Sequence, residues 1–423
     1  MYMVKDGRRA SIITEPLRYL SAPTFSQSGL IKNGSWSYAK MTLIRNDLFN
    51  EQLQIDPHAF WAKFRREFPA PLVWSQQLAG WIVCSHSTAI EIFTNRQLTT
   101  DIYGRFRPSP VPLPSSFELE DEQNRHVRRM VASYLAKPNA LLESVIIDSC
   151  RTLLSRLPIG EQFDFVTGFA DPLADLLVEG WLGVSSHTRR NLAELLRISK
   201  FDGEQYRRRA AGEIFIEQLL KEIAERRNHR TNDLLSNLAV VWDGLGGNDN
   251  DLVAFIAPLI FSLVQRNGTR LITHTVLSIC DRPELQVRIL DGGYEAARRA
   301  SIESARLEPI TQVVPRRAKE SVFVGGQLVG KGDNVFVVLT AVCRDSEFHP
   351  EPNCFNLDRA ERSLAFGYGY HSCLGQELAV TVSAIALTHL LKISKLIAYD
   401  SSSMPEFEVE FGRACTKLNI LLI

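Results

Sequence analysis

The sequence predicts one large domain that is mainly α-helical with a minor β portion. Apolar residues recur at helical spacing through most of residues 122–300. Short apolar runs beside glycine turns, which are typical of strands, occur at 71–84 and again after Pro315. No repeat or low-complexity tract divides the 423 residues. We therefore expect a single domain over 46–423, preceded by a loosely ordered N-terminal arm over 1–45 that is rich in Ser, Gly and scattered charge.

The predicted elements follow in chain order. A helix over 56–68 precedes a β-hairpin whose strands, 71–74 and 81–84, flank a Gln-Gln-Leu-Ala-Gly turn. Four prolines within 105–116 predict an irregular loop. Further helices are expected at 125–135, 141–154, 212–227, 233–242, 251–280 and 284–300, followed by strands at 321–324 and 334–339 and a last helix from 373 to about 391.

Composition excludes several classes of protein. The 48 Lys and Arg residues balance 48 Asp and Glu residues, so no whole-chain field attracts nucleic acid or an anionic membrane. Seven scattered cysteines without a C-x-x-C pair favour a reducing compartment. The N-terminus lacks an apolar signal region, and the longest apolar run, 252–264, is shorter than the roughly 18 residues of a membrane span. We expect a cytoplasmic protein that binds neither nucleic acid nor membrane.

The most informative stretch is Phe366-Gly-Tyr-Gly-Tyr-His-Ser-Cys373-Leu-Gly, in which a glycine-punctuated loop leads a cysteine into the predicted start of a helix. Backbone N–H groups at a helix N-terminus stabilise a thiolate, so the pKa of Cys373 is expected to be lowered. Such a thiolate acts as a nucleophile or as a metal ligand. Glycines at 367, 369 and 375 let a flat, bulky group approach the backbone, and no hydrolytic triad is evident nearby.

This segment resembles the haem-binding signature of the cytochrome P450 superfamily in its soluble bacterial form. The resemblance implies the cytochrome P450 fold, haem b (iron protoporphyrin IX) as cofactor, and Cys373 as the axial thiolate of the haem iron. Such a thiolate pushes electron density onto the iron. It further implies that Phe366 covers the proximal haem face, that Gly375 lies beside the cofactor, and that His371 reaches a haem propionate. The alternative is a core cysteine beside a glycine turn.

A second set of residues strengthens the resemblance. Glu303 and Arg306 have the i, i+3 spacing that places both on one helix face, a pattern that is weak by itself. They stand where the family carries its Glu-x-x-Arg motif, and Arg359 matches the third member of that structural ion-pair set. By the same resemblance Arg316 and Arg128 pair with haem propionates, because a guanidinium suits a carboxylate. Asn124 replaces the usual histidine, so one propionate contact is weakened or replaced.

The distal helix departs from the family pattern. Most members carry there an acid followed by a threonine, which deliver protons during dioxygen activation. Counting back from Pro283 places Arg266 and Asn267 at those two positions, no Asp or Glu lies between Leu252 and Cys280, and the nearest hydroxyl is on Thr269. Without a positioned donor, an ordinary oxygenase is expected to be slow or uncoupled.

Two compensations stay open. A hydroxyl or carboxyl group of the substrate, with an ordered water, would supply the proton, or the enzyme would use peroxide. Peroxide-using fatty-acid hydroxylases of this superfamily also place an arginine at the acid position, where it holds the substrate carboxylate, although they have proline where this chain has Asn267. Arg266 and Arg270 share a helix face, and a buried pair of like charges calls for an anion: a substrate carboxylate, a phosphate or a protein acid.

The leading hypothesis is a monooxygenase or oxidase that tailors a small secondary metabolite, by hydroxylation, coupling or desaturation. Its electrons would come from a ferredoxin and a ferredoxin reductase, which Arg125, Arg129 and Arg362 would help to dock. The alternatives are a peroxide-driven peroxygenase, a redox-neutral haem isomerase or dehydratase, and a haem-binding protein without catalysis. The substrate is a small molecule, and Arg266 points to an anionic one.

Overall fold

The computed structural model describes residues 43–44, 56–100, 128, 140–201, 204–244, 249, 252–253, 256–257, 259–260, 267–394, 396–399, 403–408 and 412–423. The predicted proline-rich loop, most of the predicted helix 125–135 and the first 42 residues of the predicted arm lie outside these ranges, as do Asn124 and Arg266. The predicted boundary between residues 45 and 46 also falls outside them, and strand β1 (Leu43–Ile44) precedes it.

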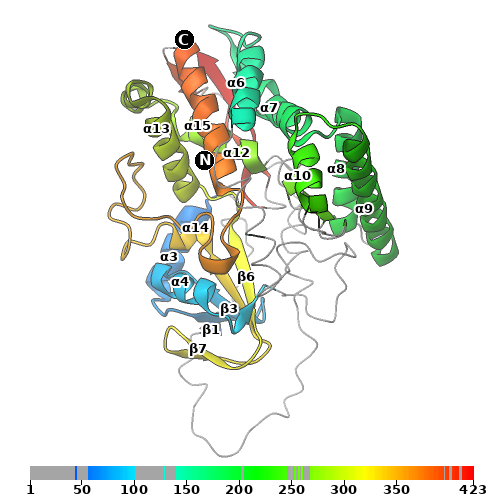
Figure 1. The fold of residues 1–423 in the computed structure, drawn as a ribbon. Coiled ribbons are helices and arrows are strands. Elements are labelled where there is room, and N and C mark those ends of the chain that lie inside the picture. The colour runs from blue at the N-terminus through cyan, green and yellow to red at the C-terminus, as the bar shows by residue number, and fades with distance from the viewer. Residues whose placement is uncertain are drawn as a thin grey trace, which may run out of the picture.

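Helices form most of the molecule, and a smaller β-rich part lies at one end (Figure 1). The mainly α prediction with a minor β portion is therefore confirmed. The described helices are α3 (Pro57–Glu67), α4 (His86–Thr94), α6 (Ala140–Leu154), α7 (Asp171–Leu177), α8 (Ser186–Phe201), α9 (Gln205–Asn228), α10 (Leu234–Gly244), α12 (Asn267–Ile279), α13 (Pro283–Leu307), α14 (Leu339–Val342) and α15 (Gln376–Ile393).

The main core joins α6, α7, α9, α10, α12, α13 and α15. Helix α15 lies against both α12 and α13, and short hydroxyl side chains let the three backbones approach closely. The Ser301 hydroxyl donates to Ser383 at 2.8 Å, and the Thr275 and Ser383 oxygens are 3.4 Å apart. Among the described helices, α15 alone is long and apolar enough to cross a membrane, but most of it is buried in this core.

The β-rich part contains a six-stranded sheet of order β1-β2-β3-β9-β6-β4. Strands β2 and β3 form the predicted hairpin, β9 lies parallel to β3, and β6 runs antiparallel to β9 with Arg316 opposite Val335. The remaining strands form the β7–β8 hairpin and two small sheets, β10-β13-β5 and β11-β12. The strands are β2 (Val73–Ser75), β3 (Gly80–Val83), β4 (Leu98–Thr99), β5 (Gln162–Asp164), β6 (Val313–Ala318), β7 (Val322–Val324), β8 (Gln327–Val329), β9 (Asn334–Val338), β10 (Ile397–Tyr399), β11 (Glu406–Glu408), β12 (Ala414–Lys417) and β13 (Asn419–Leu422).

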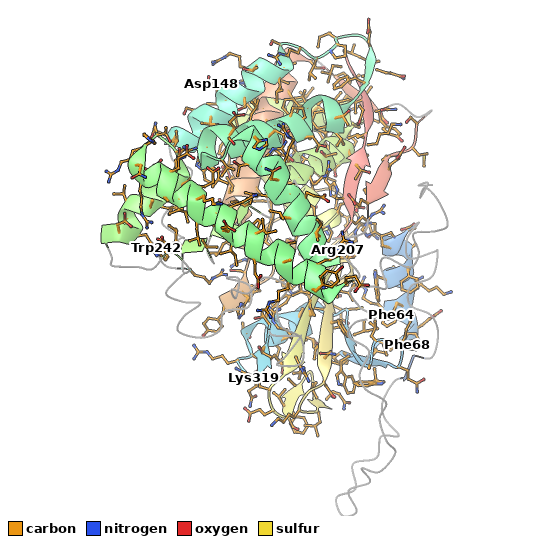
Figure 2. The ribbon with its side chains drawn as sticks, turned by 90° about the vertical axis from the view of Figure 1, so that its right-hand side faces the viewer. Phe64, Phe68, Asp148, Arg207, Trp242 and Lys319 are labelled. Carbon is orange, nitrogen blue, oxygen red and sulfur yellow. The ribbon has the colours of Figure 1, made fainter. Side chains whose placement is uncertain are left out.

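Helix α3 shows how the sequence specifies a local element. Asp56 caps it by accepting from the backbone N–H groups of His58 and Ala59, and Pro57 occupies the first turn. Trp61 and Phe64 are buried against the sheet, and the rings of Phe64 and Phe68 lie 5.1 Å apart along the helix (Figure 2). The predicted helix over 56–68 is confirmed.

Other predictions need correction. The last helix, which was predicted to start near Cys373, begins three residues later, at Gln376. The backbone is diverted before it, since the Cys373 N–H donates to the Phe366 carbonyl at 2.8 Å and Gly369–His371 form a 3₁₀ turn, η5. Helix α13 continues to Leu307, past the predicted end at residue 300, and contains a non-helical Gly293. Strand β6 was not predicted, because Pro315 and two arginines do not form a strand pattern.

The buried side chain of His349 gives a testable pH dependence. It is fully inaccessible, and among the described residues neither ring nitrogen has a hydrogen-bond partner. Burial, aided by the nearby charge of Arg306, lowers its pKa to about 4. The unfolded chain takes up this proton near pH 6.5, so the unfolded state binds more protons between that pH and the folded pKa. Stability contributed by the neutral ring is therefore complete above about pH 6.5 and is lost toward pH 4, by up to about 1.4 kcal/mol per pH unit.

We expect His349→Phe to reduce the pH dependence of the free energy of unfolding between about pH 6.5 and about pH 4. Urea unfolding between about pH 7 and about pH 5 measures it, because the difference between the variant and the parent protein removes the contribution of every other group. The exposed His187 supplies the control, as His187→Gln. An unchanged slope in His349→Phe would show that this ring does not titrate between the folded and unfolded states.

Candidate functional site

Cys373 lies on the loop that joins the η5 turn to α15. Gly367 and Gly369 adopt φ values of +69° and +71°, which only glycine tolerates readily, and they turn the chain twice. Internal hydrogen bonds close the loop: the Gly367 N–H donates to the Leu364 carbonyl at 2.8 Å, and the Ser372 N–H donates to the Gly369 carbonyl at 3.2 Å. The predicted glycine-punctuated loop thus has a defined shape that depends on its glycines.

The Cys373 thiol combines accessibility with a desolvating environment. All seven cysteines are free, and Cys373 and Cys354 have exposed side chains, while the other five are buried. Surrounding protein raises the pKa of Cys373, while the N–H groups of Gly375 and Gln376 and the charge of Arg128 act to lower it. Desolvation by the surrounding protein outweighs these effects, so the predicted lowering of the pKa of Cys373 is wrong for the free thiol. The helix N-terminus by itself does not produce a thiolate here.

Of the predicted propionate residues, Arg128 approaches this loop from a distant part of the chain, and His371 belongs to the loop itself. Arg128 donates to the Ser372 carbonyl at 2.5 Å and to the Ser372 hydroxyl at 3.4 Å. Its charge acts on the Cys373 thiol, so it lies next to the candidate ligand. His371 is in the η5 turn, and its side chain is half-buried. The structure therefore places Arg128 against the part of the loop that contains His371 and Cys373.

Arg316 is buried in strand β6. Its Nη1 donates to the Pro315 carbonyl at 2.9 Å, and its guanidinium lies over the Phe93 ring, 5.3 Å from the ring centre. Phe93 belongs to α4, and the Phe93 carbonyl faces Gly369 of the loop. Arg316 and the cysteine loop are thus connected through one residue of α4.

Phe366 anchors the loop to the helical core. It packs against a small cluster formed by Leu271 of α12, Ala305 of α13 and Val380 of α15. Three helices therefore determine where the loop lies, and the segment that carries Cys373 is held against α12. This contact links the cysteine loop to α12, which is the helix on which the distal residues were predicted.

Gly369 is the loop position most sensitive to substitution. A Cβ atom there would lie 2.8 Å from the Phe93 carbonyl oxygen, and the positive φ would strain any other residue. We expect Gly369→Ala to displace the loop and to weaken cofactor retention at least tenfold, as measured by transfer of the haem to apomyoglobin. Gly160→Ala is the matched control, since its φ of +81° is similar but a Cβ atom at this position would have no neighbour within 4 Å. Equal retention in both variants would exclude the proposed steric effect.

The predicted ion-pair set forms beside the site. The Arg306 guanidinium donates two hydrogen bonds of 2.8 Å to the Glu303 carboxylate, and the Arg359 Nε donates to Glu303 at 3.0 Å. Arg306 also donates to the carbonyl groups of Cys343, Pro352 and Cys354. These bonds fasten the end of α13 to the segment that leads into the cysteine loop. The set is structural, since all three side chains are buried among protein groups.

The described part of the distal helix contains Asn267, Thr269 and Arg270. Asn267 begins α12, and Thr269 is buried. Arg270 is also buried, and its Nη1 lies 3.2 Å from Asp171 Oδ1 on α7. Among the anions considered for this arginine, the structure provides a protein acid. Nothing local in the sequence indicated Asp171, because it lies far along the chain from its partner.

Comparison with known proteins finds one matching family model and relatives that cover most of the chain. The family model for cytochrome P450 matches residues 300–420, which include the Glu303 set and the cysteine loop. Linalool 8-monooxygenase of Pseudomonas putida is 26% identical over 410 residues, covering 89% of this chain and 97% of the relative. Pulcherriminic acid synthase of Bacillus subtilis (strain 168) is 23% identical over 354 residues, covering 78% of this chain and 86% of the relative.

Solved structures agree over nearly the whole chain. P450BioI, in a complex with acyl carrier protein ligated to hexadec-9Z-enoic acid, superposes with a TM-score of 0.75 at 19% identity and covers 88% of this chain and 100% of that one. CalO2 superposes with a TM-score of 0.75 at 22% identity, covering 89% of this chain and 98% of that one. The family model, the curated relatives and the solved structures all support the cytochrome P450 superfamily. The chain has the cytochrome P450 fold, binds haem b and is a P450-type oxidase.

The residues around Cys373 fit a haem. The thiol is accessible, and Gly375 leaves one side of the sulfur uncovered, since a Cβ there would lie 3.9 Å from Sγ. Arg128 beside the loop, His371 within it and Arg316 over the Phe93 ring of α4 supply the cationic and N–H groups that haem carboxylates require. Phe366 provides an apolar side chain at the base of the loop. This combination of a sulfur ligand, carboxylate partners and an apolar contact is chemically suited to the cofactor of the family.

Proposed function

We propose that this cytochrome P450 is a tailoring oxidase of small secondary metabolites with Cys373 as the axial ligand of its haem iron. The observation that carries this assignment is the accessible Cys373 thiol, held by a loop that turns at Gly367 and Gly369, both with positive φ. The haem, when bound, supplies the capacity to activate oxygen. In hydroxylation, one atom of dioxygen enters a substrate C–H bond and the other leaves as water, with two electrons and two protons consumed.

The protein's own groups have distinct roles in this proposal. Arg128, Arg316 and His371 bind the haem carboxylates, and Phe366 shields the sulfur from water. Asn124 contributes a weaker propionate contact than a histidine would, and Gly375 leaves room for the cofactor.

Proton delivery separates this chain from a standard family member. We assign Arg266 and Asn267 to the positions of the acid–alcohol pair, and Thr269 offers the nearest hydroxyl. An arginine does not release a proton at neutral pH, so it acts here by binding the carboxylate of an anionic substrate, whose acid–base chemistry then moves the proton. The Asp171 ion pair neutralises Arg270, which leaves Arg266 as the candidate anion-binding residue of the pair.

A peroxide-driven reaction is the second candidate, favoured by the missing acid–alcohol pair. Hydrogen peroxide then supplies one oxygen atom to the substrate C–H bond and releases the other as water, so neither external electrons nor external protons are consumed. Redox-neutral isomerase or dehydratase chemistry also needs no donor, and a non-catalytic haem-binding protein would show no turnover. For the dioxygen reaction we propose a ferredoxin and its reductase in the cytoplasm, docked with the help of Arg125, Arg129 and Arg362.

Absorption spectroscopy tests the proposal. Purified protein is recorded in the ferric state and then, reduced with dithionite, under carbon monoxide. A Soret band at the wavelength typical of a reduced carbon monoxide complex with a thiolate ligand supports thiolate ligation, and a histidine-type spectrum contradicts it.

Dodecanoate and 1-dodecanol serve as matched probes for the class of substrate. A spin-state shift that dodecanoate produces and 1-dodecanol does not, and that is lost in Arg266→Leu, supports an anionic substrate. Turnover of dodecanoate with hydrogen peroxide alone, or only with ferredoxin, reductase and NADPH, identifies the oxidant.

A further inference from the structure

The cysteine loop is anchored to the rest of the protein at Phe366, Tyr368 and Ser372. Phe366 packs in the cluster of α12, α13 and α15, and Tyr368 packs against the hydrophobic core of the β-rich part. Ser372 is held by Arg128 through its carbonyl and hydroxyl oxygens. Tyr370 differs, because 45% of its surface is exposed and it belongs to none of the core clusters formed by the described residues.

Arg96 provides the contact that holds Tyr370. It lies just after the end of α4, and its Nη2 donates to the Tyr370 hydroxyl at 2.8 Å. Its guanidinium carbon also lies 4.7 Å from the centre of the Tyr370 ring, within the range of a cation–π interaction. One side chain thus contacts both the ring and the hydroxyl group of the tyrosine. A similar but single contact joins Arg362 to Tyr368, with 5.1 Å between the guanidinium carbon and the ring centre.

The position of Tyr370 in the loop gives this surface contact its significance. Tyr370 is the middle residue of the η5 turn, His371 follows it directly, and Cys373 stands three positions after it. Gly367 and Gly369 precede it, and both lack the side chain that would restrict the backbone. Helix α15 does not begin until Gln376. The Arg96 contact is therefore placed to fix the orientation of the turn that contains His371 and precedes Cys373.

We propose that Arg96 is a positioning residue for the haem: by holding Tyr370, it keeps the η5 turn, and with it His371 and Cys373, in the geometry that receives the cofactor. The inference rests on the proposed role of Cys373 as axial ligand. Arg96 touches neither the sulfur nor the predicted propionate residues in any hydrogen bond of the described structure. Its effect is expected on the retention of the haem and on the integrity of thiolate ligation.

Two measurements test this role in the full-length holoprotein. The first is the rate of haem transfer to apomyoglobin, and the second is the rate at which the reduced carbon monoxide complex converts from the thiolate band to the neutral-ligand band. We expect Arg96→Ala to accelerate both by roughly five- to tenfold, which corresponds to the loss of one exposed cation–π contact and its hydrogen bond. The unfolding midpoint of the haem-free protein is expected to stay unchanged, because both side chains are exposed.

Further variants separate positioning from simple charge. Arg96→Lys keeps the charge but loses the planar group that covers the ring, so it is expected to resemble Arg96→Ala. Tyr370→Leu should match Arg96→Ala, and the double variant should be no worse than either, because both changes remove the same contact. Tyr370→Phe keeps the ring and should be intermediate. The exposed Arg151 on α6 and the exposed Tyr206 on α9 supply the controls Arg151→Ala and Tyr206→Leu.

The outcomes are distinct. Haem transfer in Arg96→Ala at the parent rate overturns the proposal, as does parent-like behaviour in Arg96→Lys together with additive effects in the double variant, since charge would then be the relevant property. If the parent protein shows no thiolate spectrum at all, the proposed function fails. A normal parent spectrum with unaffected Arg96 variants contradicts the positioning role alone.

Discussion

Replacing Cys373 with serine is expected to abolish both the thiolate band of the reduced carbon monoxide complex and all oxidase turnover. A serine hydroxyl does not ionise at neutral pH and is a poor ligand for iron, so the electron donation that favours O–O cleavage is lost. The change is small in volume, and the loop contacts of Phe366, Tyr370 and Ser372 do not involve the sulfur. The fold of the variant should therefore persist.

Cys354→Ser is the matched control for this experiment. Cys354 is the other cysteine with an exposed side chain, and its carbonyl, which serves Arg306 and Arg359, is retained in the variant. Absorption spectra and turnover are measured for both variants beside the parent protein. A thiolate band that survives in Cys373→Ser and disappears in Cys354→Ser would move the ligand assignment to the second cysteine.

The second large effect is expected at Glu303. Its carboxylate neutralises both Arg306 and Arg359 and accepts a hydrogen bond from the Asn356 N–H at 3.0 Å. Glu303→Gln removes the counter-charge of the buried Arg306 and leaves Arg359 with Glu361 alone, whose Oε2 lies 3.9 Å from Arg359 Nη1. Removing one partner of a buried ion pair typically costs about 3–5 kcal/mol. We expect a loss of that size in the free energy of unfolding and accelerated loss of haem, because Arg306 and Arg359 fasten the segments that lead to the loop.

The same helix contains a suitable control. Glu295 pairs with Arg299 at i, i+4 on α13, with the two atoms 3.9 Å apart and both side chains more than half exposed. Glu295→Gln should change the free energy of unfolding by about 0.5 kcal/mol or less. Urea unfolding followed by circular dichroism measures both variants. Similar small effects at the two positions would show that the Glu303 set adds little to stability.

Local spacing determined much of the fold and of the candidate site. The N-cap of α3, the hairpin of β2 and β3 and the central part of α15 follow from capping, turn and periodicity patterns within a few residues. Glu303 and Arg306 meet because an i, i+3 pair shares a helix face, whatever surrounds the helix. The glycines around Cys373 likewise predicted a sharply turned loop, and two of them have positive φ.

Some predictions failed because burial and long-range packing outweighed local rules. Cys373 was expected to have a lowered pKa from its position before a helix, but desolvation by surrounding protein raises it. Strand β6 forms from a Pro-Arg-Arg segment because β9 and β4 offer it partners on both sides. The strand propensity of individual residues predicts little where neighbouring strands supply the hydrogen bonds.

By itself, the sequence determined the mainly helical class, the family resemblance and the chemical identity of the candidate ligand, because these depend on residue type and on short spacings. The tertiary structure decided which distant groups meet. Only packing placed Asp171 beside Arg270, brought Arg128 to the Ser372 carbonyl and set Arg96 over Tyr370. The physical reason is that a contact between residues far apart in the chain depends on how whole elements pack, and no local pattern encodes that arrangement.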